Sequence, residues 1–129
     1  MLDANICIYI MNKRPPGVAE KFAEFDSDEI GISSIVVGKL SFGANKSNST
    51  RTKQVLQDFL EPITLIDFDV QAAYKYGEVR AALEQAGNPI GPHDTQIAAH
   101  ALLLNATLVT NNLKEFKKIK GLKLENWFE

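Results

Sequence analysis

The sequence predicts an α/β fold, a three-layer α/β/α sandwich in which helices cover both faces of a central, mostly parallel sheet. Short strand-like runs alternate with longer helix-like runs along the whole chain, and strands separated by helices usually pair in parallel. No repeat, linker or low-complexity segment interrupts this alternation. We therefore expect residues 1–129 to form a single domain, which suits a chain of this length.

The first half of the chain predicts two strands and three helices. Residues 1–3 indicate a strand, and its shortness is consistent with residues missing from the start of the chain. Residues 5–13 have a helical pattern, which the two prolines at 15–16 end, and the second proline suits the first turn of another helix. Residues 29–33 indicate a strand, and the serine pair that follows is typical of a helix N-cap.

The second half repeats the alternation. An amphipathic helix at residues 50–60 precedes a strand at 63–66, and a long helix at 69–85 is closed by a glycine. A glycine–proline pair opens another helix, which runs to about residue 105. The remaining elements are a strand at 106–110, a helical turn at 113–116 and a short strand at 123–124.

Composition narrows the class of protein. The formal net charge is −2, so any contact with nucleic acid must come from a local patch or from a bound metal. Cys7 is the only cysteine, which rules out an internal disulfide and predicts a reducing cytoplasmic location. We find no signal peptide and no apolar run long enough to span a bilayer, so no membrane partner is expected.

Polar side chains follow the predicted strands at their carboxyl ends, where binding sites form in open parallel sheets. Asp3 ends the first strand, Ser33 ends the second, and Asn112 follows the last long strand. Asp94 lies in the first turn of its helix on the apolar stripe, so it also points inward. Two carboxylates in one crevice repel each other, and such an arrangement usually needs a cation.

Lys39 lies in the middle of an apolar helical run, SSIVVGKLSFG, on the face of Val36 and Phe42. An inward ammonium is costly unless an acid pairs with it. Asp3 and Asp94 are the inward acids that the pattern supplies. We therefore expect a hydrogen-bonded contact from Lys39 to at least one of them.

Each of these positions also has a purely structural interpretation, and each pattern alone leaves both open. Asp94 favours a helix N-terminus, Asp3 fits an N-cap, and Asn111–Asn112 suits a turn. The lysine could reach solvent along its stem. His93 and His100 are expected to be surface or hydrogen-bonded residues rather than zinc ligands. None of these interpretations explains why the inward polar residues all fall at one edge of the sheet.

Several short motifs resemble the PIN-domain ribonucleases, and the resemblance covers essentially the whole chain. MLDANICIYI resembles the opening motif of that family, GPHDTQIAAHA its central acidic motif, and TNNLKEF its last motif. The tail GLKLENW is similar to that of the VapC-type toxins of bacterial toxin–antitoxin modules. The resemblance implies a PIN-like fold and a metal-dependent endoribonuclease that a cognate antitoxin neutralises.

The resemblance also implies roles for individual residues. Asp3 and Asp94 correspond to acids that bind Mg²⁺ or Mn²⁺, and the ion activates water to cut an RNA phosphodiester. Asn112 falls where relatives carry Asp or Asn, and with Thr110 it is expected to orient water or phosphate. Asn5 is expected to fix the position of Asp3 without binding the metal itself.

Two positions depart from the family pattern. The helix that follows Ser33 has Lys39 where the family has a glutamate, and Ala4 stands where the family has a threonine. Ser33 is expected to support the site. A lysine in place of a glutamate removes attraction for a divalent ion and adds repulsion. We therefore expect metal binding and ribonuclease activity to be weak or absent, with Lys39 neutralising the acids instead.

The resemblance implies four partners: a VapB-type antitoxin, an RNA of the tRNA or rRNA class, a second copy of the chain in a homodimer, and operator DNA through the antitoxin only. Candidates for contacts with RNA phosphates are Arg80, Arg51 and Lys46, although a solvated surface charge is the alternative for each. Apolar side chains on the helices around residues 18–25 and 55–60 exceed what a chain this small needs to bury, which predicts an interface in a homodimer or with an antitoxin.

Two other classes of protein remain open. A binding module would keep the fold and the antitoxin contact but lose catalysis, and cleavage by a Lys39→Glu chain separates the two. A receiver or haloacid-dehalogenase-like phosphotransfer domain also uses strand-end aspartates and a lysine. It fits poorly, because a dehalogenase needs an aspartate where Asn5 lies and a receiver needs its lysine later in the chain.

Overall fold

The structure is a computed structural model, and it describes residues 1–128. Its strands are all parallel: β1 (Gly31–Ser33) pairs with β2 (Thr64–Ile66), and β3 (Thr107–Val109) pairs with β4 (Lys123–Glu125). Leu2 joins the two pairs, because its N–H donates to the Gly31 carbonyl while the residue bridges Val109 in parallel. The order across the sheet is therefore β2, β1, Leu2, β3 and β4, which confirms the predicted central parallel sheet.

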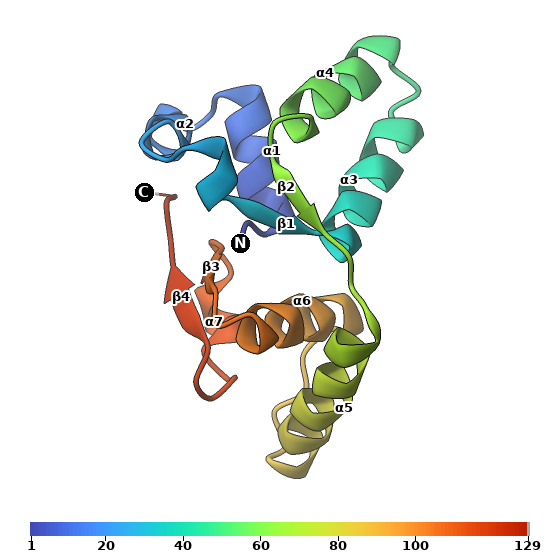
Figure 1. The fold of residues 1–129 in the computed structure, drawn as a ribbon, viewed down its shortest axis with the longest axis vertical. Helices are drawn as coiled ribbons and strands as arrows, with labels where there is room; N and C mark the ends of the chain where they lie inside the picture. Colours follow the sequence, from blue (N-terminus) through green and yellow to red (C-terminus); the bar gives the residue numbers. More distant parts are fainter. Residues whose placement is uncertain (129) are drawn as a thin grey trace.

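Helices flank these strands. In Figure 1, α1 to α4 lie toward the top and α5 and α6 toward the bottom, with β1 and the N-terminus between them. Helix α3 contacts α1, α4 and α6, and α5 packs along α6. The helices are α1 (Ala4–Asn12), α2 (Pro16–Phe22), α3 (Ser34–Lys46), α4 (Thr50–Leu60), α5 (Val70–Gln85), α6 (Pro92–Leu103) and α7 (Leu113–Phe116), with a 3-10 turn η1 (Ser27–Glu29).

The core lies where the strands meet α1, α3 and α6. Leu2, Ile32 and Leu108 from the strands and Ile97 from α6 are all fully buried. Cys7 is buried among them, and burial raises the pKa of its thiol, so it packs as a small apolar side chain rather than acting as a nucleophile. Among residues 1–128 we find no helix long and apolar enough to cross a membrane.

Two predicted strands are shorter than expected. The predicted strand at residues 1–3 reduces to the bridge at Leu2, because the helix α1 begins at Ala4. The predicted strand at 29–33 begins only at Gly31, since Asp26 and Glu29 cap each other reciprocally and hold the preceding residues in the turn η1.

The predicted interface surface is wrong at residues 18–25, while Val55 on α4 is 38% exposed. Val18 is fully buried, and Phe22 and Phe25 pack within the molecule against Phe59 and Trp127, at ring-centroid distances of 5.9 and 5.4 Å. Amphipathic helices around these residues therefore cover the protein's own core. The largest exposed apolar side chains lie instead on α3 and at the start of α5: Phe42, Val70 and Tyr74, which are 68%, 67% and 72% exposed.

Candidate active site

Asp3 is fixed at the end of the Leu2 bridge by two hydrogen bonds. Its carboxylate accepts the backbone N–H of Ala4 at 2.8 Å through Oδ1 and the hydroxyl of Thr110 at 2.8 Å through Oδ2. The side chain is nearly buried, as is that of Thr110. Asp3 also occupies the N-cap of α1, which confirms the structural interpretation of this residue.

Asp94 faces Lys39 across the space between α6 and α3. The Lys39 Nζ lies 3.8 Å from the Asp94 Oδ1, and the two side chains are 35% and 25% exposed. This distance makes an ion pair but is too long for a hydrogen bond. The predicted pairing of Lys39 with an inward acid is therefore present, while the hydrogen bond that we expected is not.

Burial and neighbouring charges shift the pKa of the Asp94 carboxyl. Burial raises the pKa of the Asp94 carboxyl, and the nearby Asp3 carboxylate raises this pKa further. The Lys39 ammonium opposes both effects and lowers it. The ion pair places Lys39 beside Asp94, and we call the region of these two side chains and Asp3 the crevice.

Glu115 is a further acid of the crevice that the sequence reasoning missed. Its charge also raises the pKa of Asp94, although its own carboxylate pairs with Lys118 at 3.3 Å. It lies on the short helix α7, three residues after Asn112. The signal available in the sequence was the three-residue spacing of Asn112 and Glu115 in the motif TNNLKEF. Residues three apart in a helix share one face, so Glu115 points toward the same edge of the sheet as the strand-end residue.

Three supporting residues take other contacts than expected. Thr110 donates its hydroxyl to Asp3, so it holds the carboxylate and is not free to orient water. Asn112 donates its backbone N–H to the Thr110 Oγ1 at 3.0 Å and forms the N-cap of α7. Asn5 is exposed, and its amide reaches Asn111 at 3.5 Å instead of Asp3. The residue that fixes Asp3 is therefore Thr110 and not Asn5.

Ser33 stabilises the base of α3 from inside the core. Its Oγ accepts the Ile35 N–H at 3.2 Å and lies 3.0 Å from the Nδ1 of His100. Both side chains are buried, and the ring of Phe68 contacts His100 edge-on. His100 is thus hydrogen-bonded, as expected, and Ser33 supports the helix that carries Lys39 without entering the crevice.

The three candidates for RNA contacts lie on three different helices. Arg80 is bound on its own helix by Glu84 and by the Tyr76 hydroxyl, each at 2.8 Å. Lys46 lies 6.0 Å from the centre of the Phe42 ring at the end of α3. Arg51 lines a groove that also includes Gly43 and Ala44 near the end of α3, while Arg80 lies on α5.

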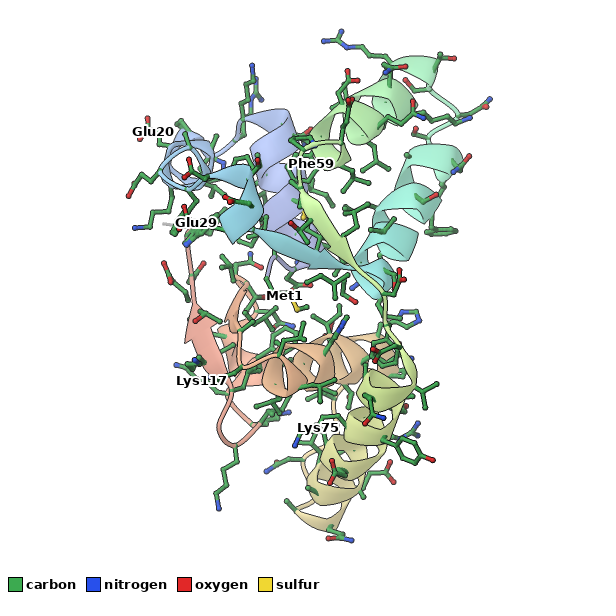
Figure 2. The ribbon with its side chains drawn as sticks, in the orientation of Figure 1. Met1, Glu20, Glu29, Phe59, Lys75 and Lys117 are labelled. Carbon is green, nitrogen blue, oxygen red and sulfur yellow. The ribbon has the colours of Figure 1, made fainter. Side chains whose placement is uncertain are left out.

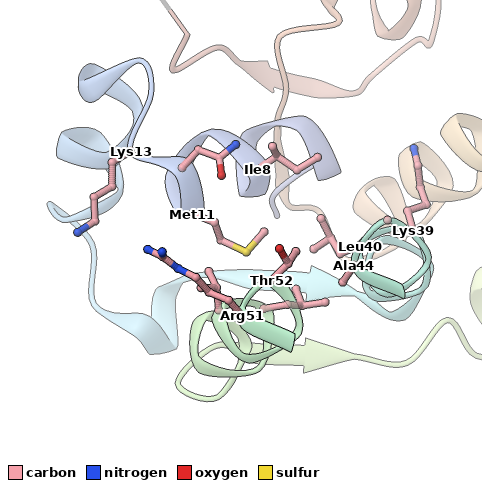
Figure 3. Close-up of a pocket in the computed structure, with 12 residues that line it drawn as sticks. Ile8, Met11, Lys13, Lys39, Leu40, Ala44, Arg51 and Thr52 are labelled. Carbon is pink, nitrogen blue, oxygen red and sulfur yellow. The ribbon is translucent and has the colours of Figure 1, made fainter. Parts of the chain in front are cut away.

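This groove lies between α1, α3 and α4, has a volume of about 700 Å³, and reaches Lys39 at one end. We call it the α1–α4 groove. Its floor is apolar and its charged lining residues are all basic among the described residues (Figure 3). The side chains that Figure 3 labels are Ile8, Met11, Lys13, Lys39, Leu40, Ala44, Arg51 and Thr52.

The residues of the crevice do not fit a divalent cation as they stand. The Lys39 ammonium lies 3.8 Å from the Asp94 carboxylate, where it would repel a cation bound to Asp94. Within residues 1–128, no cluster of three or more acidic, histidine or cysteine side chains is arranged to hold a metal. Mg²⁺ and Mn²⁺ require several oxygen ligands, which these side chains do not present together.

Comparison with known proteins places this fold in one class. The family described as PIN domain matches residues 1–122. The structure of VapBC2 from Rickettsia felis bound to a DNA fragment from its promoter matches with a TM-score of 0.90, at 44% identity over 98% of this chain and 97% of that one. DNA-bound VapBC from Salmonella typhimurium matches with a TM-score of 0.90, at 39% identity over 98% and 96%.

Curated relatives agree with the structural matches. Ribonuclease VapC2 of Rickettsia felis is 46% identical over 129 residues, covering 98% of this chain and 96% of that protein. The tRNA(fMet)-specific endonuclease VapC of Salmonella typhimurium is 39% identical over 128 residues, with the same coverage. The chain therefore belongs to the PIN-domain family and, within it, to the VapC-type toxins.

Proposed function

We propose that this chain is a VapC-type endoribonuclease toxin whose hydrolytic site is disabled by Lys39. The observation that carries the proposal is the ion pair between Lys39 and Asp94, which puts a fixed positive charge among the acids of the crevice. Residues 1–129 act as one domain in this proposal, and the protein works in the cytoplasm.

The proposed substrate is a folded RNA, with transfer RNA as the first class to test. One relative of 39% identity is named as a tRNA(fMet)-specific endonuclease, and another of 46% identity is named as a ribonuclease. Folded RNA is recognised largely through its shape and its phosphates, so no linear code for it is expected in the chain.

In the chain as it stands, Asp3 is held by Thr110, and Asp94 is neutralised in part by Lys39. An ammonium satisfies the charge of the acids but cannot generate hydroxide from water as a divalent ion does. The crevice of the parent chain therefore lacks a group that activates a nucleophile. Binding without rapid cleavage is the expected behaviour.

With Lys39→Glu, the carboxylates at positions 3, 39 and 94 would together suit Mg²⁺ or Mn²⁺, which supplies Lewis-acid activation of water when bound. The test is cleavage of a transfer RNA mixture with and without a chelator. The parent chain is expected to cut weakly or not at all, and Lys39→Glu to cut in a metal-dependent manner. Strong chelator-sensitive cleavage by the parent would contradict the role given to Lys39.

The alternative is a binding module that holds an antitoxin and has no catalytic role. The α1–α4 groove favours antitoxin binding, because it is apolar along its floor and leads to the crevice at Lys39. The structural relatives are toxin–antitoxin complexes, so a VapB-type partner and operator DNA reached through it are part of the proposal. Toxicity regained by Lys39→Glu in cells would favour the ribonuclease over the binding module.

The proposed homodimer uses the exposed side chains of α3 and α5. Phe42 lines a hollow with Ile35, His93 and Gln96, and the buried Gln96 Oε1 is the one buried side-chain oxygen without a hydrogen-bond partner in residues 1–128. A second copy would cover Phe42, which is 68% exposed. Sedimentation of Phe42→Glu should show a monomer while the parent sediments as a dimer. A parent that is monomeric at micromolar concentration would contradict the dimer.

A further inference from the structure

A strongly basic segment lies near the end of the chain, outside the crevice. Residues 114–123 contain five lysines and one glutamate, a net charge of +4 in a chain whose overall charge is −2. The glutamate is Glu115, which pairs with Lys118 at 3.3 Å. The positive charge of this segment is therefore largely uncompensated locally, and the crevice does not account for it.

The structure places part of this segment on one side of a groove. The groove has a volume of about 620 Å³ and lies between α5, the end of α6 and the residues that follow α7. We call it the α5–α7 groove. Figure 2 shows Lys75 and Lys117 on the two sides of the space below α6. Its apolar floor includes Val79, Leu83 and Leu102.

The charges around this groove leave two ammonium groups available. Glu78 is the only acid among the described lining residues, and Lys75 lies 3.8 Å from it. Lys117 and Lys120 are exposed and form no ion pair with any of residues 1–128. The rim therefore carries mobile positive charges that no acid of the described chain holds.

Helix α6 connects the crevice with this groove. Asp94 lies in its first turn and Leu102 near its last residue, so the two sites are about 12 Å apart along the helix axis at 1.5 Å per residue. A folded RNA of transfer-RNA size is longer than this separation. One RNA molecule could therefore reach the crevice and the groove together.

We propose that the α5–α7 groove binds the phosphate backbone of a folded RNA at a second place, remote from the crevice. This rests on the proposed function, that the chain acts on RNA. No aromatic side chain lines the groove within the described residues, so it lacks a platform on which unpaired bases could stack. Lysines act as flexible point charges for phosphates, which suits a backbone contact without sequence readout.

The test measures binding of a fluorescently labelled transfer RNA mixture to the full chain by anisotropy, between 50 and 200 mM salt, without added metal. Neutralising two phosphate contacts with Lys117→Ala/Lys120→Ala should weaken binding by on the order of tenfold at the lowest salt and reduce the salt slope by about 1.5. Lys21→Ala/Lys53→Ala removes the same charge from α2 and α4 and should change neither by as much. Circular dichroism confirms that each variant is folded.

Equal losses in the two double variants would overturn the proposal, because they would show a general charge effect. Unchanged binding by Lys117→Ala/Lys120→Ala would also overturn it, while leaving the proposed function intact if Lys39→Glu cuts RNA. Conversely, weakened binding in that variant together with no cleavage by Lys39→Glu would support the groove and refute the proposed chemistry. A competition with polyglutamate at the same concentration of charges tests the other occupant. If polyglutamate displaces the RNA from the parent but not from Lys117→Ala/Lys120→Ala, the groove binds an acidic protein segment instead.

Discussion

The substitution Lys39→Glu should convert the crevice from a site that repels divalent ions into one that binds them. The Lys39 ammonium lies 3.8 Å from the Asp94 carboxylate. At that distance, and with an effective dielectric constant of about 20, two unit charges interact by about 4 kcal/mol. Both side chains are partly exposed, 35% and 25%, so solvent reduces this figure substantially.

Changing the side chain at position 39 from +1 to −1 alters its product of charges with a divalent ion by about four units. If solvent reduces each unit to about 1 kcal/mol, the ion gains about 4 kcal/mol, and dehydration of the ion takes back a part. A gain of about 2.7 kcal/mol corresponds to a hundredfold in affinity. We therefore expect Lys39→Glu to bind Mn²⁺ at least about a hundredfold more tightly than the parent.

Calorimetric titration with Mn²⁺ at pH 7 measures this difference directly. Lys39→Met separates the removal of repulsion from the addition of a ligand, and its affinity should lie between those of the parent and Lys39→Glu. Lys46→Glu makes the same change of charge at the far end of α3 and should leave the affinity of the parent unchanged. Micromolar binding of Mn²⁺ by the parent, or equal affinities for Lys39→Glu and Lys46→Glu, would refute the electrostatic reasoning.

Three further predictions concern stability. Thr110→Val should lower the free energy of unfolding by about 1–3 kcal/mol, because the buried Oδ2 of Asp3 loses its donor; urea unfolding measures this, and Thr110→Ser should restore most of it. Burial lowers the pKa of His100 against the opposing charge of Asp69, so the folded state binds this proton less readily than the unfolded chain does. The free energy of unfolding should therefore fall as the pH drops below about 6.5. His100→Gln should flatten that part of a plot of melting temperature against pH, and an unchanged plot would contradict the assignment. Burial and the Asp3 charge raise the pKa of Asp94, so the free energy of unfolding should decrease as the pH rises from about 4. Asp94→Asn should remove this decrease. If the stability of the parent instead rises more steeply with pH than that of the variant, the Lys39 charge outweighs both effects.

Local patterns were sufficient for most of the secondary structure. Alternating short and long runs, the proline stops and the serine caps predicted the helices and the parallel strands, because these signals act within a few residues. They failed at residues 29–30, where a reciprocal cap between Asp26 and Glu29 holds a turn in place of the start of an extended strand. They also failed for Phe22 and Phe25, since an amphipathic pattern does not tell whether its apolar face meets the protein's own core or another molecule.

The sequence by itself determined the PIN-type resemblance and the position of Lys39 on an apolar helical face, because residue identity and helical spacing carry both. Only the tertiary structure decided which partner each polar group takes. Thr110 rather than Asn5 holds Asp3, Lys39 pairs with Asp94 without a hydrogen bond, and Glu115 joins the same electrostatic environment. It also assembled the α5–α7 groove from segments that are about forty residues apart in the chain. Such contacts depend on how α3, α6 and the strands pack in space, and distances of a few ångströms between side chains remote in the sequence leave no periodic signal along it.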